Sequence, residues 1–132
     1  MPTRASQHPT EAELEILNVL WSGGPSTVSE VHKALQADRN TGLTTTLKLL
    51  QVMTGKGLTG REPGSRPGRY IPAKPEEKTQ AGLLTDLANR AFDGSVRKML
   101  IRAVQDGDLD RDELGEIRKL IDARRRGKQG EK

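Results

Sequence analysis

The sequence predicts a mainly α-helical protein with a small β-hairpin. Apolar residues recur at helical spacing in three short segments before residue 57 and in three more after residue 75. A glycine- and proline-rich hairpin pattern separates these two groups of segments. The whole chain has one Trp, one Tyr and one Phe, so its core has to be built from aliphatic side chains, which suits helices.

Three helices are expected in the first half of the chain. The first begins after Thr10 and the second after Thr27, because a glutamate follows each threonine three residues later, as in a capping box. The third helix is expected from about Leu43 to Lys56, with Leu47 and Leu50 facing inward. The apolar stripe of the first helix is expected to comprise Leu14, Leu17, Val19, Leu20 and Trp21.

A β-hairpin is expected directly after the third helix. Two strand-like runs, 58–62 and 69–71, flank a turn of glycines and prolines that includes Arg66. Three helices followed by a hairpin with a basic tip are the layout of a winged helix-turn-helix domain. In such a domain the third helix enters the major groove of DNA, and the wing lies along the backbone or the minor groove. We therefore assign residues 10–74 to this domain and residues 1–9 to a flexible N-terminal arm.

Positive charge is concentrated in the predicted third helix and hairpin. Residues 42–74 contain six bases and one acid, whereas the net charge of the whole chain is +4. A helix start such as that at Thr44 and Thr45 suits phosphates and base edges, and Lys48 lies within one turn of it. We predict double-stranded DNA as the partner, contacted by Thr44, Thr45, Lys48, Arg61, Arg66 and Arg69. A solvated basic surface, with Thr44 acting only as a helix cap, is the alternative.

Residues 75–126 are expected to form a helical dimerisation region, and residues 127–132 a basic flexible tail. Three amphipathic segments are present, and the last begins with a capping-box pattern at Asp110 and Glu113. Helices this short are marginal alone, and a core shared by two subunits buries more apolar surface. A helical cap on the first domain is the alternative. The residues expected at the homodimer interface are Leu84, Leu87, Phe92, Val96, Leu100, Leu114, Ile117 and Ile121.

Nothing in the sequence indicates catalysis, a metal site or a cofactor. The absence of cysteine excludes disulfides, thiolate ligands and cysteine nucleophiles. His8 lies in the predicted N-terminal arm, and His32 has no second histidine, cysteine or ordered carboxylate pair near it, so we expect a protein that is not an enzyme. No apolar run approaches about 18 residues and no apolar signal segment begins the chain, so we expect a cytoplasmic protein without a membrane segment.

The order and spacing of six segments in the chain match a pattern known from a protein family. These segments are Glu11–Trp21, Thr27–Val31, Leu43–Leu47, Lys56–Leu58, Gly68–Tyr70 and Asp108–Leu114. Together they resemble the penicillinase-repressor family, of the BlaI, MecI and CopY type, over about residues 10 to 121. The resemblance implies a homodimeric transcriptional repressor that binds a dyad-symmetric operator. It also implies that the helix from Leu43 reads the DNA and that the helices after Pro75 interlock with the partner subunit. A winged-helix interaction module without specific DNA binding is the alternative.

Particular residues bear on how such a repressor would be released. In the antibiotic-responsive members of the family, a sensor-protease pathway cuts the repressor within its dimerisation helices, so the resemblance implies a regulatory protease as a further partner. The corresponding stretch here is Ile101–Val104, and it lacks the Asn–Phe bond of those members. The copper-responsive members have a C-terminal cysteine motif. This chain has no cysteine, so copper sensing through thiolates is excluded.

Overall fold

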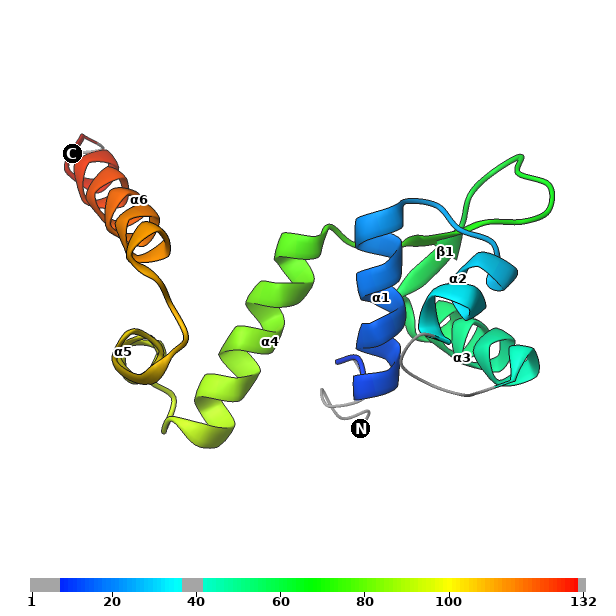
Figure 1. Cartoon of the computed structure of the whole chain (residues 1–132), viewed down its shortest axis with the longest axis horizontal. Helices are drawn as coiled ribbons and strands as arrows, with labels where there is room; N and C mark the ends of the chain where they lie inside the picture. The colour runs from blue at the N-terminus through cyan, green and yellow to red at the C-terminus, as the bar shows by residue number, and fades with distance from the viewer. Residues whose placement is uncertain (1–7, 37–41, 131–132) are drawn as a thin grey trace. The chain divides into compact units, whose positions relative to one another are not determined.

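The computed structural model describes residues 8–36 and 42–130 (Figure 1). It confirms the predicted fold class, because helices dominate and one antiparallel hairpin accompanies them. The chain divides into two compact units, with the boundary between Leu83 and Leu84. The elements are α1 (Glu11–Gly23), α2 (Val28–Leu35), α3 (Leu43–Lys56), β1 (Thr59–Arg61), β2 (Tyr70–Pro72), α4 (Glu76–Ala91), α5 (Val96–Asp106) and α6 (Arg111–Gly130).

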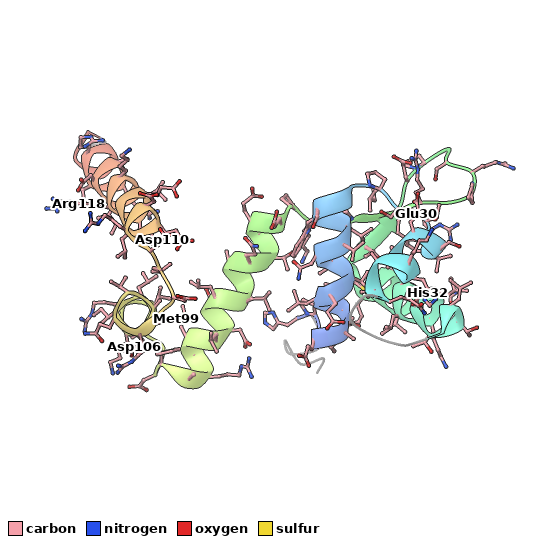
Figure 2. All side chains as sticks on the ribbon, in the orientation of Figure 1. Glu30, His32, Met99, Asp106, Asp110 and Arg118 are labelled. Carbon is pink, nitrogen blue, oxygen red and sulfur yellow. The ribbon has the colours of Figure 1, made fainter. Side chains whose placement is uncertain are left out.

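The predicted capping boxes determine where three helices begin. Before α1, the backbone N–H of Thr10 donates to Glu13 Oε1 at 2.9 Å, and the N–H of Glu13 donates to Thr10 Oγ1 at 3.2 Å. Thr27 makes the same pair of bonds before α2 with Glu30, which is labelled in Figure 2. The third box joins Asp110 to Glu113 at the start of α6. Each box satisfies N–H groups that a helix start leaves without partners.

The core of the first unit lies between α1, α2, α3 and the hairpin, which pack against one another. Two expectations about it need correction. Ile16 is fully buried, whereas Leu14, Val19 and Trp21 are only partly buried at the edge of the core. On α3, Leu47 is half-buried, and the neighbouring Thr46 takes the buried position. The reason is that the buried face of α3 follows the helical spacing of Thr46, Leu50 and Met53.

The hairpin is shorter than predicted and is tied to the segment before α2. β1 and β2 pair antiparallel, with Arg61 opposite Tyr70. Leu58 lies outside β1 because its N–H donates to Met53 O at the end of α3. Ser26 and Tyr70 exchange two backbone hydrogen bonds, of 3.1 and 2.7 Å, which attach the wing to the helical part of this unit.

The end of α3 contains two glycines, of which the structure explains one. Gly57 has a φ of +82°, a left-handed conformation that glycine adopts without strain, and it terminates the helix. Gly55 lies inside the helix, and a side chain there would meet nothing within 4 Å. Packing within the described residues therefore gives no reason for Gly55.

The second unit leaves most of its large apolar side chains exposed. In the described part of the chain, Ala88 is the one buried residue of α4, and α5 has none. Three other predicted interface residues, Phe92, Val96 and Ile117, are half-buried. None of the described helices is both long and apolar enough to cross a lipid bilayer. The exposed large side chains of this unit are Leu84, Leu87, Leu100, Ile101, Val104, Leu114, Leu120 and Ile121.

Candidate nucleic-acid interface

The start of α3 is open to solvent and has no side-chain cap. Gly42, which has no side chain, occupies the N-cap position, and no side chain of the described residues caps the helix. The N-cap is therefore Gly42 and not Thr44, which lies inside the first turn of the helix. Uncapped N–H groups and the positive end of the helix dipole attract anions such as phosphate. Thr44 and Thr45 are both exposed beside these groups.

One face of α3 presents polar side chains away from the core. Thr44 and Lys48 are one turn apart and exposed, and Gln51 continues the same face at helical spacing. Val52 is also exposed, to 47%, although it is apolar. Gln51 and Val52 were not among the predicted contact residues, although their spacing of three and four residues from Lys48 could have identified them.

His32 connects the two helices of the helix-turn-helix. Its side chain, labelled in Figure 2, extends from α2, and its Nδ1 lies 3.3 Å from Oγ1 of the buried Thr46 of α3. On the other side of the ring, His32 Nε2 lies 3.1 Å from Gln36 Nε2. This arrangement gives His32 a structural role in orienting α3. Sequence spacing did not reveal it, because Thr46 is 14 residues away.

A buried ion pair holds the end of α3 against α1. Lys56 Nζ lies 2.8 and 3.0 Å from the two carboxylate oxygens of Glu13, which is only 3% exposed. Burial raises the pKa of Glu13, but the hydrogen bonds from Lys56 and from the Thr10 backbone outweigh it and hold the pKa below its ordinary value. Lys56 is therefore engaged within the fold, although it contributes to the basic excess of residues 42–74.

The wing holds its arginines in three different environments. Arg69 Nη2 lies 2.7 Å from Glu62 Oε1, a charge contact without hydrogen-bond alignment. The Arg61 guanidinium lies over the Tyr70 ring, 5.1 Å from its centroid, in cation–π geometry. Arg66 is exposed at the turn. Tyr70 itself is buried in the core.

The turn of the wing is organised by one hydroxyl group. Ser65 Oγ donates to Glu62 O at 3.0 Å and accepts from the backbone N–H of Arg69 at 2.9 Å. These bonds close the loop across the turn that contains the exposed Arg66. The structure thus brings Arg61, Arg66 and Arg69 together on one hairpin, and Thr44, Thr45 and Lys48 together at one helix start. Within the described ranges, no cluster of three His, Cys, Asp or Glu side chains suits a metal ion.

The described arrangement is three helices followed by a hairpin that carries arginines. A known protein family matches most of the chain that has this arrangement. The family described as penicillinase repressor matches residues 9–123. The chain belongs to the penicillinase repressor family. Among its relatives, the transcriptional regulator BlaI of Mycobacterium tuberculosis is 34% identical over 97 residues, which cover 72% of this chain and 70% of BlaI.

More distant members of the penicillinase repressor family match a longer part of the chain. The methicillin resistance regulatory protein MecI of Mammaliicoccus sciuri is 20% identical over 112 residues, 85% of this chain and 91% of MecI. MecI of Staphylococcus aureus strain N315 matches with the same identity and coverage. The match to the family, over residues 9–123, extends through both units of the chain.

Proposed function

We propose that this chain is a sequence-specific DNA-binding transcriptional repressor that acts as a homodimer on a dyad-symmetric operator. The observation that supports this most directly is the start of α3, which is exposed, has glycine at its N-cap and is connected to α2 through His32 and Thr46. The other end of the helix is held against α1 by the ion pair between Lys56 and Glu13. Relatives named as a transcriptional regulator and a methicillin resistance regulatory protein support the same role. Repression would follow from occupancy of the operator, without an enzymatic step or a cofactor, in the cytoplasm.

The two groups of candidate residues have different expected roles. Thr44, Thr45 and Lys48 of α3 would contact base edges in the major groove, where threonine methyl groups also suit thymine. Arg61 and Arg66 of the wing would contact phosphates. Arg69 would do so in competition with Glu62, which already holds its guanidinium. Phosphate contacts supply affinity and salt dependence, whereas the α3 contacts supply sequence preference.

The homodimer would form through the exposed apolar side chains of the second unit. Side chains such as Leu84, Leu87 and Leu100 are 43%, 44% and 54% exposed, and a partner subunit would remove them from water. Two linked winged helices then bind two half-sites at once, which raises affinity without new contacts. Release would follow from whatever lowers the dimer population. The stretch Ile101–Val104, which corresponds to the segment cut by a sensor-pathway protease in antibiotic-responsive members, lies within α5.

Selection of binding sites from a random duplex DNA pool at fixed, near-physiological salt tests this function. The expected result is an inverted repeat whose half-sites lie about one helical turn apart. Recovery of no motif by a folded, dimeric protein would contradict the repressor and favour a winged-helix protein-interaction module. A motif without dyad symmetry would contradict the homodimeric arrangement but not the DNA binding.

Gly68→Ala is expected to weaken DNA binding several-fold while leaving the fold intact. A Cβ at Gly68 would collide with Arg61 Nη2 and lie 3.2 Å from Arg61 Cζ, so the guanidinium has to leave its place over Tyr70. Because the displaced group is the end of a flexible side chain and only its cation–π contact is lost, the free energy of unfolding should change by at most about 1 kcal/mol. DNA affinity by fluorescence anisotropy and thermal unfolding together check both expectations.

Gly60→Ala in β1 is the matched control for this substitution. A Cβ at Gly60 would meet only Ile71 Cγ1 at 3.9 Å, an ordinary contact that leaves Arg61 in place. Equal DNA affinities of the two variants would show that the position of the Arg61 guanidinium does not matter for binding.

A further inference from the structure

A surface cavity of about 140 Å³ lies within the first unit, where the base of the hairpin meets the first turns of α4. Leu58, just before β1, and Lys74, just after β2, line it from the hairpin side. Lys78, Thr79 and Gly82 line it from α4. None of these residues is a proposed DNA contact, so the proposed function leaves the cavity without a role.

Helical spacing brings the three α4 residues to one face. Pro75 O accepts from the N–H groups of Lys78 and Thr79, at 3.0 and 3.3 Å, so the helix begins directly after the hairpin. Successive residues are about 100° apart around a helix, so Gly82 points between these two. A Cβ at Gly82 would have only His8 Cε1 near it, 4.0 Å away. The glycine therefore leaves open the space between the two polar side chains.

The polar side chains that line the cavity carry positive charge or can donate hydrogen bonds. Lys74 and Lys78 supply two ammonium groups, Thr79 supplies a hydroxyl, and His8 lines the same cavity. The described residues that line it include no carboxylate. The side chains of Lys74, Lys78 and Thr79 make no hydrogen bond or ion pair with another described residue. An anion in the cavity would therefore meet donors that this part of the fold has not used.

We propose that this cavity binds a small phosphate monoester. A phosphate group has a charge of about −1.5 to −2 at pH 7 and three acceptor oxygens. It matches two ammonium groups and a hydroxyl better than a carboxylate does, which has one charge and two oxygens. Pro9 and Leu58 supply an apolar wall for the carbon part. The cavity has the volume of roughly five liquid waters, which suits a phosphate with a short carbon chain.

The position of the cavity favours a free ligand over the DNA backbone as the source of the phosphate. Leu58 follows the end of α3, where its N–H donates to Met53 O. Thr44 lies at the other end of this 14-residue helix, which is about 20 Å long. The cavity is also at the base of the hairpin, whereas Arg66 is at its turn. We expect a duplex bound by α3 and the wing to leave the cavity open.

Titration calorimetry of the full-length chain with glycerol 3-phosphate, at constant ionic strength, tests the site. The expected result is saturable binding of one molecule per chain. Lys78→Gln is expected to weaken this binding about tenfold, because it removes a charged donor from the cavity. Lys33→Gln is the matched control, since it removes one lysine charge from the exposed surface of α2 and does not line the cavity. It is expected to bind glycerol 3-phosphate like the wild type.

Two substitutions at Gly82 test the shape of the cavity without any change of charge. Gly82→Ala adds a Cβ that makes at most an ordinary contact with His8, so it is expected to keep the binding. Gly82→Leu places a larger side chain in the cavity and is expected to weaken binding more than tenfold. Both residues are better helix formers than glycine, and thermal unfolding confirms that each variant is folded.

The outcomes separate this site from the proposed function. Weak binding by Lys78→Gln and Gly82→Leu, with wild-type binding by their two controls, supports the site. Absence of saturable binding by the folded wild-type chain overturns it, and so does an equal loss in Lys33→Gln. Acetate that binds as tightly as glycerol 3-phosphate overturns the choice of a phosphate ligand.

Duplex DNA supplies one more comparison. Displacement of glycerol 3-phosphate by a duplex overturns the proposal, because the cavity would then belong to the DNA interface. Simultaneous binding of both supports a separate site. The calorimetry needs no operator, so the repressor is tested independently by the selection of binding sites.

Discussion

Lys56→Met is expected to lower the free energy of unfolding of the first unit by about 3 kcal/mol. The substitution keeps the length of the side chain but leaves the carboxylate of Glu13, which is only 3% exposed, without its cation. Breaking one side of a buried ion pair typically costs about 3–5 kcal/mol, and we expect the lower end because Lys56 is itself 25% exposed. Thermal unfolding should show a fall in Tm of more than about 10 °C.

Lys33→Met on the exposed surface of α2 is the control for this loss. It removes one lysine charge and changes the composition in the same way, but its effect on the free energy of unfolding should stay within about 0.5 kcal/mol. Equal Tm values of the two variants would show that the Lys56–Glu13 pair adds nothing to stability.

The same ion pair predicts how stability depends on pH. The pKa of Glu13 in the folded protein lies below its ordinary value of 4.5. The stabilisation is therefore fully present above pH 4.5, and it is lost as the pH falls through the lowered folded value. Lys56→Met removes a hydrogen bond and a charge that lower this pKa, so the variant should lose less stability on acidification. Urea unfolding at a series of pH values from 7 downward, about one unit apart, checks this difference.

Lys48→Ala is expected to cost about 1–3 kcal/mol of DNA-binding free energy and to relax the sequence preference at one base pair. Lys48 lies on the exposed face of α3, one turn after Thr44, where a side chain can reach a base edge. Its removal should leave stability almost unchanged, because the side chain is exposed. Repeating the site selection with the variant, together with affinities for single-base changes, measures both effects.

Arg66→Ala is the contrasting variant, because Arg66 lies at the exposed turn of the wing. It should weaken all duplex sequences alike and reduce the slope of log affinity against log salt by about one. If both variants weaken all sequences equally, the division between base contacts from α3 and phosphate contacts from the wing is wrong.

The sequence by itself determined where the helices begin and which fold class they form. The boxes at Thr10, Thr27 and Asp110 each join residues only three apart, so their signal is local and needs no tertiary contact. The alternation of helical spacing and a glycine- and proline-rich turn is equally local. Helix α3 was expected at the bounds that the structure shows, Leu43–Lys56.

Only the tertiary structure decided which charges are engaged within the fold and which residues form the core. In the sequence, Lys56 and Arg69 are bases of the segment 42–74 just as Lys48 and Arg66 are, and nothing there distinguishes them. In the structure, however, Lys56 pairs with Glu13 across 43 residues, and Arg69 pairs with Glu62. Tertiary packing also decided that Thr46, and not Leu47, is buried in the core. Such contacts depend on the angle and register at which helices pack, and periodicity within one helix does not specify either.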